Sequence, residues 1–173
     1  VQGAATLGGE YKRYGRVAIN THGASIPAPL LHYIQREGEL LILKNQAIGI
    51  GVPEKFHFTI DFLADFNSFQ RYGASIGDDF DEGTLGVTKL YVTRDGPGGD
   101  QRMEPQSPVQ IICYYTQDMP WETVPTLLHE MNHAVHASNY GVMPVWLQEG
   151  MSEWFANRKY ILGVGKKVGL ILQ

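Results

Sequence analysis

Apolar and polar residues alternate with a period of two in several stretches of the chain, as in β-strands. The clearest stretch is residues 55–62, KFHFTIDF, where phenylalanine or isoleucine occupies every second position. Residues 15–21, 84–94 and 108–116 show the same alternation more weakly. The last two flank a glycine-rich link, which predicts an antiparallel hairpin. We therefore expect a mixed β-sheet built from these four segments.

A second pattern, with a period near 3.6 residues, predicts helices between and after the strands. It runs through residues 28–47, where Ser25 is the expected N-cap and Pro27 falls in the first turn. Gly38 weakens this helix. A shorter helix is expected over residues 64–72. With these helices packed on the mixed sheet, we expect an α+β fold.

The sequence HEMNH, residues 129–133, lies within a third helical stretch over residues 120–136. In a helix, His129 and His133 lie one turn apart on the same face, which is the spacing that lets two imidazoles hold one zinc ion. Glu130 is then the candidate general base, because a water that attacks a carbonyl beside zinc needs a carboxylate to take its proton. A catalytic zinc site requires a third ligand.

A fourth helical stretch, residues 143–155, supplies a candidate for that ligand. Pro144 suits the first turn, and Glu149 and Glu153 are four residues apart on one face bordered by aromatic side chains. Two carboxylates in such surroundings are costly to bury without a cation. We assign Glu149 as the third ligand and Glu153 as the acceptor for the outer nitrogen of a ligating histidine.

These two stretches resemble the zinc metallopeptidases of the gluzincin type, the clan of thermolysin and aminopeptidase N. HEMNHAV is similar to the thermolysin-like active-site helix, and WLQEG resembles the segment that carries the third ligand in aminopeptidase N-like and peptidase MA-like domains. The resemblance implies zinc ligands at His129, His133 and Glu149, and a catalytic glutamate at Glu130. It also places Glu153 where the thermolysin pattern has an acid beside the ligands.

Fifteen residues separate His133 from Glu149, a shorter connection than in thermolysin or aminopeptidase N. The length is more similar to compact bacterial peptidase MA-like domains. The resemblance implies a zincin-like fold, in which a twisted mixed sheet packs on the HExxH helix and a second helix follows with the third ligand. It also implies that an edge strand pairs with an extended substrate, for which residues 87–93 are the candidate. His57 and Asp61, on the polar face of their strand, are not expected to join the zinc.

The sequence does not decide which residue would stabilise the oxyanion, the negatively charged oxygen that forms when water attacks the substrate carbonyl. Gluzincins usually present a later tyrosine or histidine, and here His136, Tyr140 and Tyr160 are the possible contacts to substrate or transition state. His136 lies two turns after His129 and is compatible with a fourth ligand as well. A polar residue at a helix end is the favoured interpretation of His136.

The length of 173 residues suits one domain over the whole chain, with residues 1–14 as a loose lead-in. A hydrophobic content of 43% and a net charge of −4 are typical of a soluble protein and argue against nucleic-acid binding. No apolar run is long enough for a membrane span. The acidic residues 76–83 are interpreted as a solvated loop in preference to a calcium site, and the lone Cys113 as a small buried residue.

The first residue, Val1, follows no visible leader, so the compartment stays open and is compatible with secretion or a periplasmic location. The apolar, glycine-interrupted end at Gln173 suggests a piece of a longer protein.

From the sequence we expect zinc-dependent hydrolysis of a peptide or protein substrate, with Zn2+ as cofactor. Two alternatives remain: an inactive zincin-like binding or scaffold module, and a zinc hydrolase of a non-peptide amide. Oligomeric state and cleavage specificity are not predicted.

Overall fold

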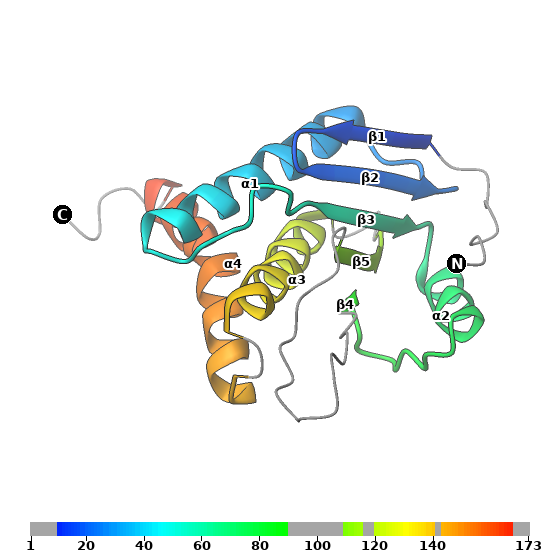
Figure 1. Ribbon diagram of the computed structural model, residues 1–173. Coiled ribbons are helices and arrows are strands. Elements are labelled where there is room, and N and C mark those ends of the chain that lie inside the picture. Colours follow the sequence, from blue (N-terminus) through cyan, green and yellow to red (C-terminus); the bar gives the residue numbers. More distant parts are fainter. Residues whose placement is uncertain (1–9, 90–108, 116–119, 141–142, 168–173) are drawn as a thin grey trace, which may run out of the picture.

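The computed structural model describes residues 10–89, 109–115, 120–140 and 143–167, which form a mixed sheet and four helices (Figure 1). The sheet has five strands in the order β1-β2-β3-β5-β4. Their bounds are Glu10–Tyr14 (β1), Val17–His22 (β2), Phe58–Leu63 (β3), Gly86–Lys89 (β4) and Val109–Tyr114 (β5). The three central strands are parallel, while β1 and β4 run antiparallel to their neighbours. The α+β class and the antiparallel β4–β5 pair are therefore confirmed.

Four helices accompany the sheet: Ala28–Ala47 (α1), Phe66–Ser75 (α2), Pro120–Tyr140 (α3) and Val145–Lys167 (α4). Helices α1 and α3 pack on one face of the sheet, and α4 packs along α3 (Figure 1). Helix α2 packs on the other face. The order of layers leaves α3 between the sheet and α4.

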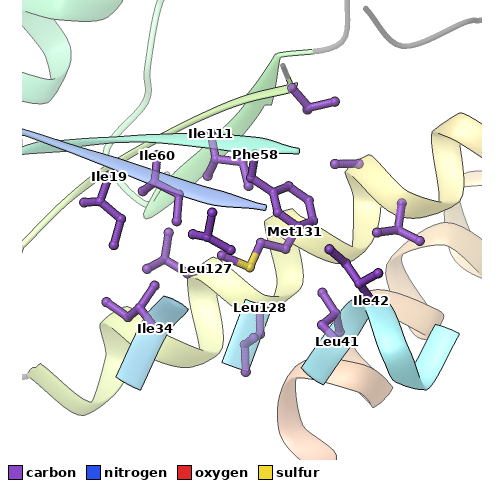
Figure 2. Close-up of a cluster of buried hydrophobic side chains, with 14 of the residues drawn as sticks. Ile19, Ile34, Leu41, Ile42, Phe58, Ile60, Ile111, Leu127, Leu128 and Met131 are labelled. Atoms are coloured by element: carbon purple, nitrogen blue, oxygen red, sulfur yellow. The ribbon is translucent and has the colours of Figure 1, made fainter. Parts of the chain in front are cut away.

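The main core lies between the sheet and the pair α1 and α3. Figure 2 shows Phe58, Ile60 and Ile111 of the strands pointing toward Leu127 and Met131 of α3. Met131, which is fully buried, is the central residue of HEMNH, so one face of that motif is a core face. Burying such side chains contributes about 1.5–3 kcal/mol each, and this packing fixes how α3 is rotated against the sheet.

The second face of the sheet holds a smaller core and a buried polar group. Asp61 of β3 lies on this face, as its strand period predicted, and is 4% exposed. Its Oδ1 accepts a hydrogen bond from His22 Nε2 at 2.6 Å, and its Oδ2 accepts one from Gln110 Nε2 at 2.6 Å. These bonds satisfy the carboxylate away from the HEMNH face of the sheet.

Several local predictions differ from the structure. Residues 10–14 form an edge strand where a loose lead-in was expected, because their backbone pairs with β2; residues 1–9 lie outside the described part. Ser25 is not the N-cap of α1; Pro27 is, without a side-chain hydrogen bond. In α2 the cap is Asp65, which accepts from the Ser68 amide at 2.7 Å.

Two further boundaries were misplaced. Helix α4 begins at Val145 and continues to Lys167, beyond the expected end at residue 155. The predicted strand 84–94 is described only to residue 89, so most of the proposed edge segment 87–93 lies outside the described residues.

In the acidic loop, Asp78 pairs with Lys89 of β4, whereas Asp79, Asp81 and Glu82 are exposed. Among the described helices, none is long and apolar enough to cross a membrane.

Two glycines within helices provide a matched test of this packing. A Cβ at Gly38 of α1 would lie 2.8 Å from Val17 Cγ2 and 3.2 Å from Met131 Sδ, while one at Gly150 of α4 would meet nothing within 4 Å. We expect Gly38→Ala to lower the free energy of unfolding by about 1–3 kcal/mol through overpacking. Gly150→Ala should raise it by about 0.5–1 kcal/mol. Urea unfolding of the metal-free protein measures both, and a stabilised Gly38→Ala would contradict the α1–β2–α3 packing.

Candidate metal centre

Helix α3 brings His129 and His133 together as their spacing predicted. Their Nε2 atoms are 2.8 Å apart, and the rings meet edge to face with centroids 4.5 Å apart. Residues four apart lie one above the other on a helix, so the imidazoles converge without distortion of the backbone. Both rings are largely buried, and their Nε2 atoms point toward the same spot between the two side chains.

Helix α4 adds Glu149 to this pair. Its Oε2 lies 3.2 Å from His129 Nε2 and its Oε1 lies 3.5 Å from His133 Nε2. Ligand atoms held about 2.0–2.1 Å from one tetrahedral ion are about 3.3 Å from each other. The Nε2–Nε2 separation and the distance from Glu149 Oε2 to His129 Nε2 agree with that value to within about half an ångström. One ligand atom from each of His129, His133 and Glu149 lies within 4.8 Å of the other two, so the three residues could hold a metal ion.

The Nδ1 atoms, on the other side of each imidazole ring, lie near side-chain oxygen atoms of α4. Glu153 Oε1 lies 3.1 Å from His129 Nδ1, at ion-pair distance although not at hydrogen-bonding angle. Ser152 Oγ lies 3.2 Å from His133 Nδ1 and is fully buried. An acceptor at Nδ1 keeps the proton there and leaves the Nε2 lone pair for a metal. Helix α4 thus carries Glu149, a possible ligand, and two side chains whose oxygen atoms lie next to the Nδ1 atoms of the histidines.

Ser152 was missed by the sequence reasoning, which assigned this role to Glu153 alone. Its position, three residues after Glu149 and therefore on the same side of the helix, was the available signal. A serine in a helix is common without any such partner, so that signal is weak.

The local electrostatics favour an unprotonated imidazole at His133. Burial lowers the pKa of His133, the neighbouring His129 lowers it further, and the carboxylates of Glu130, Glu149 and Glu153 oppose this shift. A neutral imidazole is the form that binds metal. Glu149 is 52% exposed, so the group opens to solvent on the α4 side.

The side chain of Glu130 reaches β4, the described edge strand of the sheet. Thr88 of β4 donates a hydrogen bond to Glu130 Oε2 at 2.6 Å. Gly86, two residues earlier, leaves the space for this approach: a Cβ there would lie 3.2 Å from Glu130 Cγ. The predicted base therefore lies between the two histidines of its own helix and the described edge strand.

His136 lies in the core, which corrects both of its proposed site roles and its interpretation as a polar residue at a helix end. The side chain is 0% exposed. Its Nε2 donates to Asn45 Oδ1 at 3.2 Å, and its Nδ1 accepts from Asn132 Nδ2 at 3.3 Å. Asn45 Nδ2 in turn donates to Asn132 Oδ1 at 3.2 Å. The three side chains close a ring of hydrogen bonds that ties α1 to α3.

Two other sequence-based candidates need comment. Tyr140 ends α3, but its side chain, like that of Tyr160 in α4, lies outside the described part of the protein, so their proposed contacts stay predictions. Cys113 is buried, as expected. Burial raises the pKa of its thiol well above the usual range, and the carboxylates of Asp61 and Glu130 add to the rise. A protonated thiol is a poor metal ligand and nucleophile.

Comparisons with protein-family models, curated proteins and solved structures found no match to this chain.

Ser152→Ala tests the role of the serine beside His133. Removing the acceptor for Nδ1 should weaken zinc binding by about 10–100-fold, the usual effect of losing such a partner. Competition with a chromogenic chelator measures the affinity. Ser68→Ala, a serine of α2 outside the group, is the control and should bind zinc as the wild type does. Equal affinities of Ser152→Ala and wild type would show that the contact does not orient the ligand.

The core histidine predicts a pH dependence of stability. Burial, with a smaller effect from His133, lowers the pKa of His136 to about 4. Its ordinary value is about 6.5, so between pH 6.5 and 4 the unfolded chain binds a proton that the folded chain does not. The stability that the neutral His136 adds to the folded protein is therefore complete above pH 6.5 and is lost as the pH falls toward 4.

Urea unfolding of metal-free wild type and His136→Gln across this pH range checks the effect. The variant is expected to be less stable at pH 7 and to lose less further stability on acidification. Parallel losses in the two proteins would mean that His136 does not stay neutral in the folded state.

Proposed function

We propose that this protein is a zinc-dependent hydrolase of peptide bonds, similar in its catalytic groups to the gluzincin metallopeptidases and in its arrangement to a zincin-like domain. The observation that carries the proposal is the convergence of His129, His133 and Glu149 beside Glu130. Two neutral imidazoles and one carboxylate are a ligand set typical of catalytic zinc. Softer metals would favour thiolate ligands, and magnesium or calcium would favour oxygen ligands alone.

The number of ligands supports a catalytic site over a structural one. Structural zinc is closed by four protein ligands, whereas catalytic zinc keeps one position for water or substrate. Among the described residues, the group whose ligand atoms lie within 4.8 Å of one another has three members, His129, His133 and Glu149. His136, the obvious fourth candidate in sequence, is engaged in the core. When bound, zinc would supply a Lewis acid that lowers the pKa of water toward ~7 and polarises a carbonyl group.

Glu130 fits the role of general base by its place and its partners. It follows the first histidine directly, and its carboxylate is half-buried next to the edge strand. From there it can take a proton from the attacking water and pass it to the leaving amine. The same carboxylate then performs both proton transfers. The neighbouring histidines and Glu149 define where that water must lie.

The edge position of β4 supports an extended peptide as substrate. Among the described strands β4 pairs only with β5, so its other edge has no strand partner in the described part of the protein, as an added strand would require. A peptide can bind there through backbone hydrogen bonds, independently of its side chains. Because Thr88 of this strand touches Glu130, a peptide on β4 would pass close to the base.

Two other functions would use the same residues. A binding or scaffold module would hold zinc without turnover, and a hydrolase of another amide would turn over without preferring peptides. Turnover separates the first from the proposal, and a comparison of peptide libraries with small amides separates the second. The open strand edge favours the peptide, since a small amide gains nothing from it.

The proposal predicts opposite outcomes for two glutamate variants. Glu130→Gln should keep about one zinc per chain and lose activity by about 10²–10⁴-fold, because only the proton acceptor is removed. Glu149→Ala should lose zinc or bind it far more weakly. Elemental analysis of protein purified without chelator gives the metal content, and cleavage of a mixed peptide library gives the activity.

Glu54→Gln, an exposed glutamate before β3, serves as the control for charge removal. It should match the wild type in both measurements. Full activity in Glu130→Gln would remove Glu130 from the mechanism, and zinc content unaffected by Glu149→Ala would remove Glu149 from the site.

A further inference from the structure

We propose that Thr88 of β4 is a positioning residue whose hydroxyl group fixes the carboxylate of Glu130. The inference rests on the proposed function for its catalytic consequence, but the contact itself does not depend on it. The Thr88 hydroxyl lies 2.6 Å from Glu130 Oε2 and 2.9 Å from the main-chain oxygen of Glu130. The shorter contact joins a hydroxyl to a carboxylate, which is the stronger kind of hydrogen bond.

The backbone of β4 determines where this hydroxyl lies. Gly86 and Thr88 are two apart in a strand and so point to the same side, toward α3. At Gly86 a Cβ would meet Thr126 Cγ2 at 3.1 Å and Glu130 Cγ at 3.2 Å, so strand and helix are in near contact. Thr88 is β-branched, and its χ1 angle is restricted by the strand. The hydroxyl is therefore a rigid donor.

A glutamate needs such a partner if it is to act as a base at a fixed place. Its side chain has three rotatable bonds, and Glu130 is only half-buried, so packing alone leaves it several orientations. The bond from Thr88 engages Oε2 and leaves Oε1 to accept the proton. Misplacement of a catalytic group by about 1 Å can cost about 10²-fold in rate.

The same strand then controls two parts of the reaction. β4 offers its open edge to the peptide and, through Thr88, holds the base. Peptide and base are thus both placed by one short piece of backbone, Gly86–Lys89, which pairs with β5 and faces α3. A shift of the strand would move both together and preserve their relative geometry.

A purely structural role for Thr88 makes a different prediction. If the hydroxyl served only to hold β4 against α3 through the main-chain oxygen, its loss would disturb the substrate edge and raise KM. If it orients Glu130, its loss lowers kcat and leaves KM nearly unchanged.

Kinetics of four variants distinguish the two roles. Thr88→Val, which keeps the shape without the hydroxyl, and Thr88→Ala are expected to lower kcat by about 10–100-fold with KM within about twofold of wild type. Thr88→Ser, which restores the hydroxyl, should recover most of kcat. Thr59→Val on β3, a strand threonine separated from β4 by β5, is the control and should match the wild type. A raised KM with unchanged kcat in both hydroxyl-free variants would overturn the proposal.

A second measurement requires no activity. Crystal structures of metal-free wild type, Thr88→Ser and Thr88→Val would show one orientation of the Glu130 carboxylate in the first two and several, or a different one, in the third. An unchanged single orientation in Thr88→Val would overturn the positioning role. If the wild type cleaves no peptide, the proposed function fails, and these structures still decide whether Thr88 holds Glu130.

Discussion

Helix α4 packs along α3, and this contact places Glu149 and Glu153 against His129 and His133. The two imidazoles are largely buried, whereas the carboxylates of Glu149 and Glu153 are more than half exposed and approach them from the solvent side. Helix α4 also supplies Ser152 to the outer nitrogen of His133. The three proposed ligands and the groups next to them all come from this one helix pair.

Helix α3 has two different faces, and the protein uses both. Met131 packs into the main core, and Asn132 and His136 join Asn45 of α1 in a closed ring of hydrogen bonds. These contacts resist rotation of the helix about its axis. His129, His133 and Glu130 lie on the same helix, so these buried contacts help to set the positions of the site groups. Such support from packing is what a site requires to hold its geometry.

The sequence predicted the parts of the site that depend on local spacing. The histidine pair follows from a four-residue interval in one helix, and Glu149 from a second amphipathic segment nearby. His136 was misinterpreted because its partner Asn45 lies on α1, 91 residues earlier, where no local pattern reveals it. Thr88 and Ser152 were missed for the same reason: their roles come from contacts between elements. Likewise, residues 10–14 form a strand because β2 offers them a pairing edge.

The central claim is that zinc binds to two imidazoles and one carboxylate and keeps an open position. X-ray absorption at the zinc edge of the wild-type protein tests it directly. The account predicts a shell of nitrogen and oxygen atoms at about 2.0–2.1 Å, with the scattering of two histidine rings and no sulfur. A sulfur shell near about 2.3 Å, or the scattering of a third ring, would contradict it.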